Sequence, residues 1–341
     1  MSDIKVNNIQ SLSGTNGPEI SGITEMNSTG AMSLPRGDTA YRGGRGRGIF
    51  GGGRTSPEGI RDTIDYFTIA TLGNATDFGN LTNATSEFGG CASSTRGIFM
   101  GGETFPTNIN NIQYLTISQL GNTFDFGDLT RQKRGTAGLS NNTRGICVGG
   151  NSAPTITSFT EMEFITINSL GNASRFGDTS VTFTYGMSNA SPTRGIIALS
   201  NSPYASPYPA LNTIEYITIS TEGNAKDFGD LTDKRKEGAG ASNSTRGLFF
   251  GGANPSNTNI IDYITIASLG DAIDFGDCIN GSSLSNACSS PTRAIFGDMT
   301  GDGDSISYVT IMTTGNAQDF GDLTVARNQT AGFSDSHGGL G

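Results

Sequence analysis

The sequence predicts an all-β protein, a six-bladed β-propeller, and three observations support this fold class. The segment Thr-Arg-Gly-Ile-Cys-Val-Gly-Gly at 143–150 recurs at intervals of about 44 to 52 residues, a period typical of propeller blades and large solenoid repeats. Short runs of Thr, Ile, Tyr and Phe alternate with Gly and Asn, as in a succession of strands and turns. A Gly-Asn or Gly-Asp step recurs in every repeat. It indicates a hairpin and therefore antiparallel pairing, which favours a propeller over a parallel β-helix.

The first part of each repeat is an opening strand that starts with a basic residue and ends in a glycine doublet such as Gly101-Gly102. Glycine permits close backbone approach, so we expect this strand to lie innermost, beside the propeller axis. His337 stands in the basic position of a truncated seventh copy. The arginines of the six full copies are Arg47, Arg96, Arg144, Arg194, Arg246 and Arg293.

Three further strands follow the opening strand. The second part reads Ile-x-Tyr-Ile-Thr-Ile, as at 214–219, and is apolar on both faces over most of its length, which fits a strand covered by neighbouring blades. The third reads Asn-Ala-x-Asp-Phe-Gly-Asp-Leu-Thr, and the fourth is a strand of small residues, as at 137–140. The last small-residue strand, 330–334, is expected to pair near 48–53 and so close the six-bladed ring, which removes exposed sheet edges.

Composition limits the possible partners. The chain has 341 residues with a formal charge of −10 and no basic stripe, which argues against nucleic-acid binding, since phosphate contacts need clustered Lys and Arg. The N-terminus has no apolar signal-peptide region, and no run of about 18 apolar residues predicts membrane insertion. The four cysteines have no zinc-ligand spacing, and we expect them to be buried and reduced; a Cys278–Cys288 bridge stays open as an alternative.

The order of parts resembles the kelch repeat, in which a Gly-Gly doublet ends one strand, an aromatic-bearing strand follows and a basic residue precedes the returning strand. The stretch from Arg134-Gly-Thr-Ala-Gly-Leu to Gly149-Gly150 follows that order, as does Arg327-Asn-Gln-Thr-Ala-Gly. The chain departs from kelch proteins in having no tryptophan. The resemblance implies a kelch-like propeller over residues 41–341 in which phenylalanines take the packing role of the kelch tryptophan: Phe78, Phe126, Phe176, Phe228, Phe275 and Phe320.

Residues 1–40 lie outside the repeat and are expected to form an extended arm. The segments Ile4-Lys-Val-Asn-Asn-Ile-Gln, Gly17-Pro-Glu-Ile and Asn27-Ser-Thr-Gly-Ala-Met-Ser-Leu-Pro-Arg36-Gly resemble the leader of structural and fibre proteins from tailed phages of marine cyanobacteria. The resemblance implies a virion component, a tail fibre, adhesin or decoration protein assembled in the host cytoplasm. The arm would dock on other virion proteins, and the propeller would present a surface to a host glycan or protein.

Three groups of residues are candidate sites. The arginine ring is one candidate ligand crown, but we favour a structural role: each arginine recurs in register with the Phe-Gly-Asp aspartate, which predicts arginine–aspartate pairs. The acidic loop with Asp298, Asp302 and Asp304 offers carboxylates of the kind that Ca²⁺ binds, against the simpler interpretation of a solvated turn. Tyr204 and Tyr208, on a proline-rich loop, are candidates for stacking against a sugar or for capping a blade.

Enzymatic activity is not expected. His337 is the only histidine, so the chain offers neither a Ser-His-Asp nor a Cys-His set, nor the histidine ligands of a copper oxidase. A carboxylate-only glycosidase would need a unique acidic pair, and none stands out from the repeats. Two alternatives to the virion component stay open: a kelch-like intracellular interaction scaffold and, less favoured, a carbohydrate-active enzyme.

Overall fold

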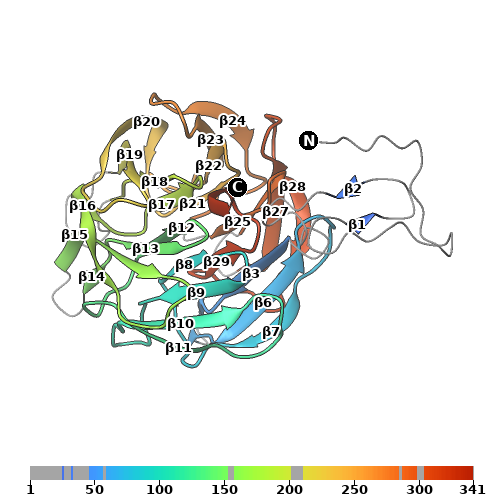
Figure 1. The fold of residues 1–341 in the computed structure, drawn as a ribbon. Helices are drawn as coiled ribbons and strands as arrows, with labels where there is room; N and C mark the ends of the chain where they lie inside the picture. Colours follow the sequence, from blue (N-terminus) through green and yellow to red (C-terminus); the bar gives the residue numbers. More distant parts are fainter. Residues whose placement is uncertain are drawn as a thin grey trace, which may run out of the picture. The chain divides into compact units, whose positions relative to one another are not determined.

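The computed structural model describes residues 46–341 except 57–58, 153–156, 201–209, 284–285, 298–302 and 341. It also describes β1 (Glu25–Met26) and β2 (Met32–Ser33), which pair antiparallel in a first unit, Met1–Arg45. The second unit, Gly46–Gly341, is a ring of six antiparallel sheets, a six-bladed β-propeller (Figure 1). The predicted fold class is therefore confirmed.

The innermost strand of each blade is the small-residue strand, so the prediction that the opening strand lies innermost is wrong. Innermost strands of successive blades contact one another around the axis, and only small residues allow six backbones to converge there. The innermost strands are β8 (Gly89–Ala92), β12 (Ala137–Ser140), β17 (Met187–Ala190), β21 (Ala239–Ser242), β25 (Ala287–Ser289) and β29 (Ala331–Ser334).

The arginine-bearing opening strand is the second strand from the axis and pairs on both sides. The second strands are β3 (Arg47–Gly51), β9 (Arg96–Met100), β13 (Arg144–Val148), β18 (Arg194–Ala198), β22 (Arg246–Phe250) and β26 (Arg293–Gly297). The third strands are β6 (Thr63–Thr68), β10 (Asn111–Thr116), β15 (Thr157–Thr166), β19 (Leu211–Thr218), β23 (Ile260–Thr265) and β27 (Ser305–Thr310).

The outermost strand of each blade carries the Phe-Gly-Asp motif, which in β7 reads Phe-Gly-Asn. These strands are β7 (Thr76–Asn80), β11 (Phe124–Asp128), β16 (Ser174–Phe183), β20 (Lys226–Arg235), β24 (Ile273–Asp277) and β28 (Gln318–Asp322). Three short strands lie in loops, and the described chain ends in a short 3-10 helix: β4 (Arg54–Thr55), β5 (Gly59–Ile60), β14 (Asn151–Ser152) and η2 (Gly338–Leu340).

The last strand of the chain closes the ring, as predicted. β29 pairs antiparallel with β3, with Ala331 opposite Gly51 and Ser334 opposite Gly48. The two strands come from opposite ends of the propeller sequence, so their pairing ties the first blade to the last turn of the chain. The end of the chain thus supplies the innermost strand of the first blade, and β3 is not left as an open edge.

The motif phenylalanines pack inside the blades, which confirms their predicted role. Phe78 is buried and its ring meets Tyr66 edge-on, with ring centroids 6.0 Å apart. Phe320 also meets Phe67 of the next blade at 5.4 Å. Edge-to-face aromatic pairs of this kind add stabilisation beyond the buried area alone. The phenylalanines therefore hold neighbouring blades together as well as the blade that carries them.

The four cysteines are buried and none forms a disulfide, which confirms the prediction of reduced thiols and excludes the Cys278–Cys288 bridge. Burial raises the pKa of the Cys147 thiol to about 11. A thiol with so high a pKa stays protonated at neutral pH and is a poor nucleophile or metal ligand. These cysteines are core residues.

The Gly-Asn step does not form a tight hairpin. Third and outermost strands do pair antiparallel, but the connection between them is longer, and the Gly-Asn step latches onto the neighbouring blade. At the ring-closing interface, the N–H of Gly73 donates to the Phe320 carbonyl at 3.0 Å, and the N–H of Asp322 donates to Asn74 Oδ1 at 3.2 Å. The same two bonds recur at every interface.

The six arginines do not pair with the motif aspartates; among the described residues, none of the ion pairs joins them. Each guanidinium instead lies over the aromatic ring of its own third strand, as Arg96 lies 4.5 Å from the Tyr114 ring centroid. Its Nη1 then donates to a carbonyl of the next blade, as Arg96 does to Ile167 at 2.8 Å. An aromatic face and a carbonyl satisfy the cation without a carboxylate. The motif aspartates take part in the contacts between blades through their backbone N–H groups, which bond the side chain of the Gly-Asn or Gly-Asp step in the next blade.

A buried polar residue in the third strand, which the sequence analysis treated as mostly apolar, anchors each blade to the one before it. Asp65 accepts a hydrogen bond from Thr324 Oγ1 at 2.6 Å and forms an ion pair with Arg327 at 3.0 Å, with both side chains fully buried. Equivalent pairs join Arg235 to Asp262 at 2.8 Å and Lys133 to Glu163 at 3.1 Å. These three pairs stand at every second blade interface.

Candidate functional site

The central channel has a narrow waist of small residues. Glycine is needed there because a Cβ at Gly332 would lie 2.9 Å from the carbonyl oxygen of Ala287 in the neighbouring innermost strand. The waist separates two hollows that share these strands. The waist residues are Gly90, Gly138, Ser188, Gly240, Ala287 and Gly332.

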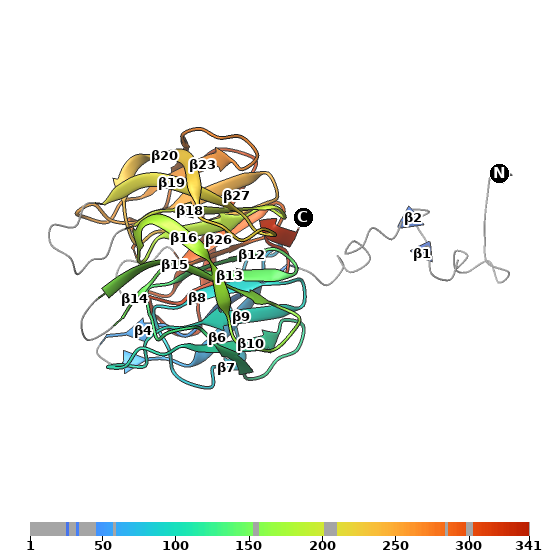
Figure 2. The same ribbon diagram turned by 60° about the vertical axis from the view of Figure 1, so that its left-hand side comes forward.

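One end of the channel is plugged by the last described residues, His337 and η2 (Figure 2). The His337 Nε2 lies 2.8 Å from the Ala92 carbonyl oxygen, and its Nδ1 accepts the Gly339 N–H at 3.1 Å. This pattern fixes the neutral imidazole with its proton on Nε2. Burial lowers the pKa of His337 to about 4. The propeller also begins at this end, because Gly46 precedes β3 and donates its N–H to Asp335 at 2.7 Å.

The other end is open, and we call it the mouth. Its edge is formed by the residue two positions before each innermost strand, and five of these residues have a left-handed backbone: Glu87, Gly135, Tyr185, Glu237 and Gln329, with φ between 55° and 64°. The sixth position, which precedes β25, falls within residues 284–285, and these lie outside the described residues. A left-handed backbone is uncommon for residues other than glycine and costs about 1–3 kcal/mol each.

Backbone hydrogen bonds run around the mouth from blade to blade and hold this conformation. The Gly135 N–H donates to the Glu87 carbonyl at 2.6 Å, the Tyr185 N–H to Gly135 at 2.9 Å, and the Glu237 N–H to Tyr185 at 2.9 Å. The Glu87 N–H continues the chain to Gln329 at 3.2 Å. These backbone hydrogen bonds hold the mouth residues in position, and they do not require a particular side chain at any of the positions.

Glu87 is the centre of the polar contacts at the mouth. Its carboxylate accepts hydrogen bonds from the Tyr185 hydroxyl and, at 2.9 Å, from the Gln329 amide, and it lies 3.4 Å from Arg134 Nε. Arg134 also pairs with Glu103 at 2.7 Å. Burial raises the pKa of Glu87, although Tyr185 and Arg134 act in the opposite direction. A carboxylate with so many partners is held at one position and orientation.

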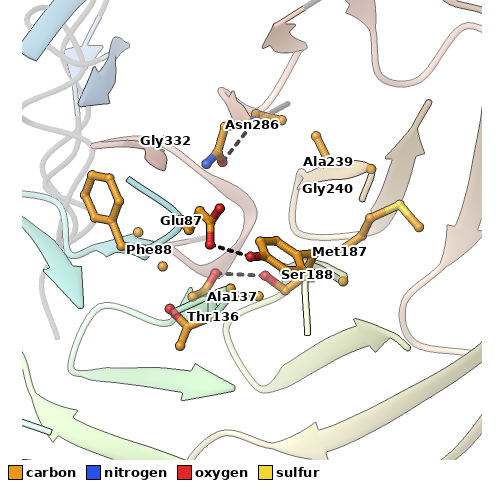
Figure 3. Close-up of a pocket in the computed structure, with 18 of the residues that line it drawn as sticks. Glu87, Phe88, Thr136, Ala137, Met187, Ser188, Ala239, Gly240, Asn286 and Gly332 are labelled. Carbon is orange, nitrogen blue, oxygen red and sulfur yellow. Dashed lines mark hydrogen bonds between the residues drawn. The ribbon is translucent and has the colours of Figure 1, made fainter. Parts of the chain in front are cut away.

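The hollow at the mouth encloses about 650 Å³, counting the part that is open to solvent. Figure 3 shows Glu87, Thr136, Ser188 and Asn286 gathered around this hollow, with Phe88 and Met187 beside them. The hollow is therefore open to solvent and has a rigid polar wall around Glu87.

Of the site residues predicted from the sequence, Asp304 alone lies within the described part of the chain. Tyr204, Tyr208, Asp298 and Asp302 lie outside the described residues. Asp304 is exposed, and its backbone carbonyl accepts the N–H of Leu323 at 2.7 Å. Within the described part of the chain, no three His, Cys, Asp or Glu side chains are grouped so as to hold a metal ion.

The mouth residues were missed because each was considered within its own repeat. Aligned blade against blade, the position that edges the mouth holds Glu87, Gly135, Tyr185, Glu237 and Gln329, whereas the arginine position holds the same residue in all six blades. This contrast between a variable and a constant position was present in the sequence. Its meaning depended on knowing that the variable position faces the channel.

No protein-family model matches the chain, and no curated protein matches it in sequence. None of the helices in the described residues is long and apolar enough to cross a membrane.

Proposed function

We propose that the protein is a non-enzymatic component of a tailed-phage virion that displays its propeller as a recognition module and binds its ligand at the mouth. The observation that carries this proposal is the variation of the mouth residues. Framework positions repeat from blade to blade, while the edge of the mouth holds a different side chain in almost every blade. If the mouth residues served only to maintain the shape of the propeller, they would repeat from blade to blade as the framework residues do.

The position of Gly46 supports the orientation that display requires. Residues 1–45 join the propeller at Gly46, which lies at the plugged end. An arm that docks on the particle would thus be attached to the propeller at the plugged end. The resemblance of the segment 27–37 to a phage leader supports the particle as the docking partner.

The contacts of Glu87 support binding over catalysis. A general acid or base needs to exchange a proton with a substrate, but the Glu87 carboxylate already engages Tyr185, Gln329 and Arg134. His337, the only histidine, lies at the plugged end. The mouth is organised as a fixed surface for recognition.

Mass spectrometry of purified virions tests the proposal. We expect the chain to copurify with particles of the phage whose genome encodes it, and an antibody against the mouth loops to decorate intact particles in electron micrographs. A chain found only as free protein in the infected cell, absent from particles, would contradict the virion role and favour the kelch-like interaction scaffold.

A further inference from the structure

Leucine recurs at one surface position of the repeat, directly before the Gly-Asn or Gly-Asp step that follows the third strand. The position lies at the plugged end, because the third strand ends beside the start of the second, as Thr116 pairs with Arg96. That start follows the end of β8, where Ala92 contacts the plug. Single exposed leucines are common in proteins, but here the same position is leucine in four blades. These leucines are 57% or 59% exposed: Leu72, Leu120, Leu170 and Leu269.

The turn that carries these leucines does not depend on them. Glu222 in the fourth blade and Thr314 in the sixth occupy the same position. Both blades keep the latch, since the N–H groups of Gly223 and Gly315 donate to phenylalanine carbonyls of the preceding blades at 2.9 and 2.8 Å. The latch therefore holds each leucine in place, and the fold does not need the leucine side chain.

Three further exposed apolar residues stand at the same end. Phe124 and Ile273, 62% and 58% exposed, are the first residues of β11 and β24, and Met312, 56% exposed, lies two residues beyond β27. Seven of the ten large apolar side chains that are exposed in the described part of the chain thus lie at the plugged end. We call these seven residues the apolar rim. Exposed apolar side chains gathered at one end of a protein mark a contact with another molecule.

The exposed charges beside the apolar rim are mainly negative. In the connections and the first two residues of the outermost strands, the exposed cations are Arg175 and Lys226, and the exposed carboxylates are Asp77, Asp125, Glu222, Asp227, Asp271, Asp274 and Asp319. The six arginines of the second strands are half-buried, and each already lies over a ring and bonds a carbonyl. Two copies of the chain joined by this end would bring like charges together, and an anionic lipid surface would meet the same repulsion. The rim is therefore suited to a protein that offers apolar side chains together with lysine or arginine.

We propose that the apolar rim lies against a protein of the phage particle, one that presents apolar side chains with Lys and Arg beside them. This inference rests on the proposed function, because it names the kind of virion protein that the propeller contacts. Residues 1–45 join the propeller at Gly46, which lies at the same end. A virion protein that binds those residues is tethered to this end of the propeller, and a tethered contact needs little affinity of its own. The rim is thus a second contact with the particle, in addition to the arm.

Cosedimentation with particles assembled without this chain tests the inference. The purified full chain is added to such particles, and the bound fraction is measured against the concentration of the chain. Leu120→Glu and Leu170→Glu, combined in one variant, should weaken binding at least about tenfold, because each change removes an apolar contact and adds a carboxylate. Glutamate is compatible with the turn, as Glu222 shows, so the variant keeps the fold. Asp274→Arg, which copies Arg175 of the third blade, should weaken binding roughly two- to fivefold.

Val181→Glu is the matched control, because Val181 is 40% exposed but lies near the mouth end of β16. Its binding to particles should equal that of the unmodified chain. Equal binding by the leucine variant would show that residues 1–45 suffice, which overturns the inference and leaves the virion role standing. If no form of the chain sediments with particles and the chain is absent from virions, the virion role fails and the inference falls with it.

Two further measurements on the same samples exclude the other occupants of the rim. Analytical ultracentrifugation measures self-association, and flotation with vesicles of phosphatidylcholine and phosphatidylglycerol measures lipid binding. We expect the unmodified chain and the leucine variant to behave alike in both. Self-association or vesicle binding that the leucine variant loses, while it keeps its binding to particles, would assign the rim to a second copy of the chain or to a lipid surface and overturn the inference.

Discussion

The contacts between blades and the mouth of the channel are built by the same six repeats, yet they differ in how strongly the residues are constrained. Between blades, an arginine donates to a carbonyl of the next blade six times. At the mouth, a glutamate, a glycine, a tyrosine, a second glutamate and a glutamine occupy one equivalent backbone position. Interlocking contacts fix residue identity between blades, whereas at the mouth a ring of backbone bonds holds all the described positions and side-chain bonds join only some of them.

The difference teaches where stability and recognition reside in this propeller. A residue that bonds two blades is constrained by its partner. At one interface both members of the charged anchor differ, with Gln113 in place of the carboxylate and Thr85 in place of the cation. At another, Glu215 stands opposite Phe183 and accepts the Ser180 N–H instead. At the mouth, backbone bonds carry the structure, so a side chain can change without loss of the ring. Substitutions in the two regions should therefore have opposite effects on folding and on binding.

The largest effect is expected at the ring-closing interface. Arg327→Ala leaves the buried Asp65 carboxylate without its cation, which should lower the free energy of unfolding by about 3–5 kcal/mol. Chemical denaturation measures the change. The control is Glu161→Ala, which removes the exposed Arg131–Glu161 pair and should cost less than about 1 kcal/mol. Equal costs for the two variants would contradict the role given to the buried anchor.

The inter-blade latch provides a second test with an internal control. Gly321 and Gly315 have φ of 148° and 150°, but only a Cβ at Gly321 meets another residue, the Gly73 backbone at 2.6 Å. We expect Gly315→Ala to cost about 1–2 kcal/mol from backbone strain, and Gly321→Ala to cost about 3 kcal/mol because the clash adds to that strain. If the two variants unfold at the same denaturant concentration, close approach is not the reason for glycine at 321.

The plugged end should make stability depend on pH. His337 is neutral in the fold, with its pKa lowered by burial to about 4, whereas the unfolded chain takes up a proton below about pH 6.5. Its contribution is thus complete above pH 6.5 and is lost as pH falls toward 4, by about 1–3 kcal/mol. His337→Gln should flatten that part of the curve of unfolding free energy against pH. An unchanged curve would show that the imidazole is not buried in the plug.

The smallest effect on folding is expected at the mouth. Tyr185→Phe removes one hydrogen bond to Glu87 while it keeps the ring and the backbone bonds. The free energy of unfolding should change by less than about 1.5 kcal/mol. Thermal and chemical denaturation check this. A loss as large as that of Arg327→Ala would place Tyr185 in the framework and remove the contrast on which the proposed function rests.

The sequence was sufficient to predict the blade number, the antiparallel order, the closing strand and the packing of Phe78 and its equivalents, because these depend on local patterns that repeat. The opening strand was wrongly predicted to lie beside the axis because of its glycine doublet. The strand that lies there, as at Gly89–Ala92, consists of small residues along its whole length. The sequence analysis paired the arginines with aspartates, because spacing along the chain does not show that Tyr114 and a carbonyl of the next blade lie nearer. The site around Glu87 depends on residues brought together from four blades, which no single repeat contains.

The most direct test of the contrast between framework and mouth measures binding and stability on the same samples. Variants at the mouth, Gln329→Asn and Tyr185→Phe, are compared with the latch variant Gly321→Ala, each by ligand titration and by chemical denaturation. Lower affinity at nearly unchanged stability for the mouth variants, and lower stability at unchanged affinity of the folded fraction for the latch variant, is the predicted result. Mouth variants that keep full affinity, or that unfold as readily as the latch variant, would contradict it.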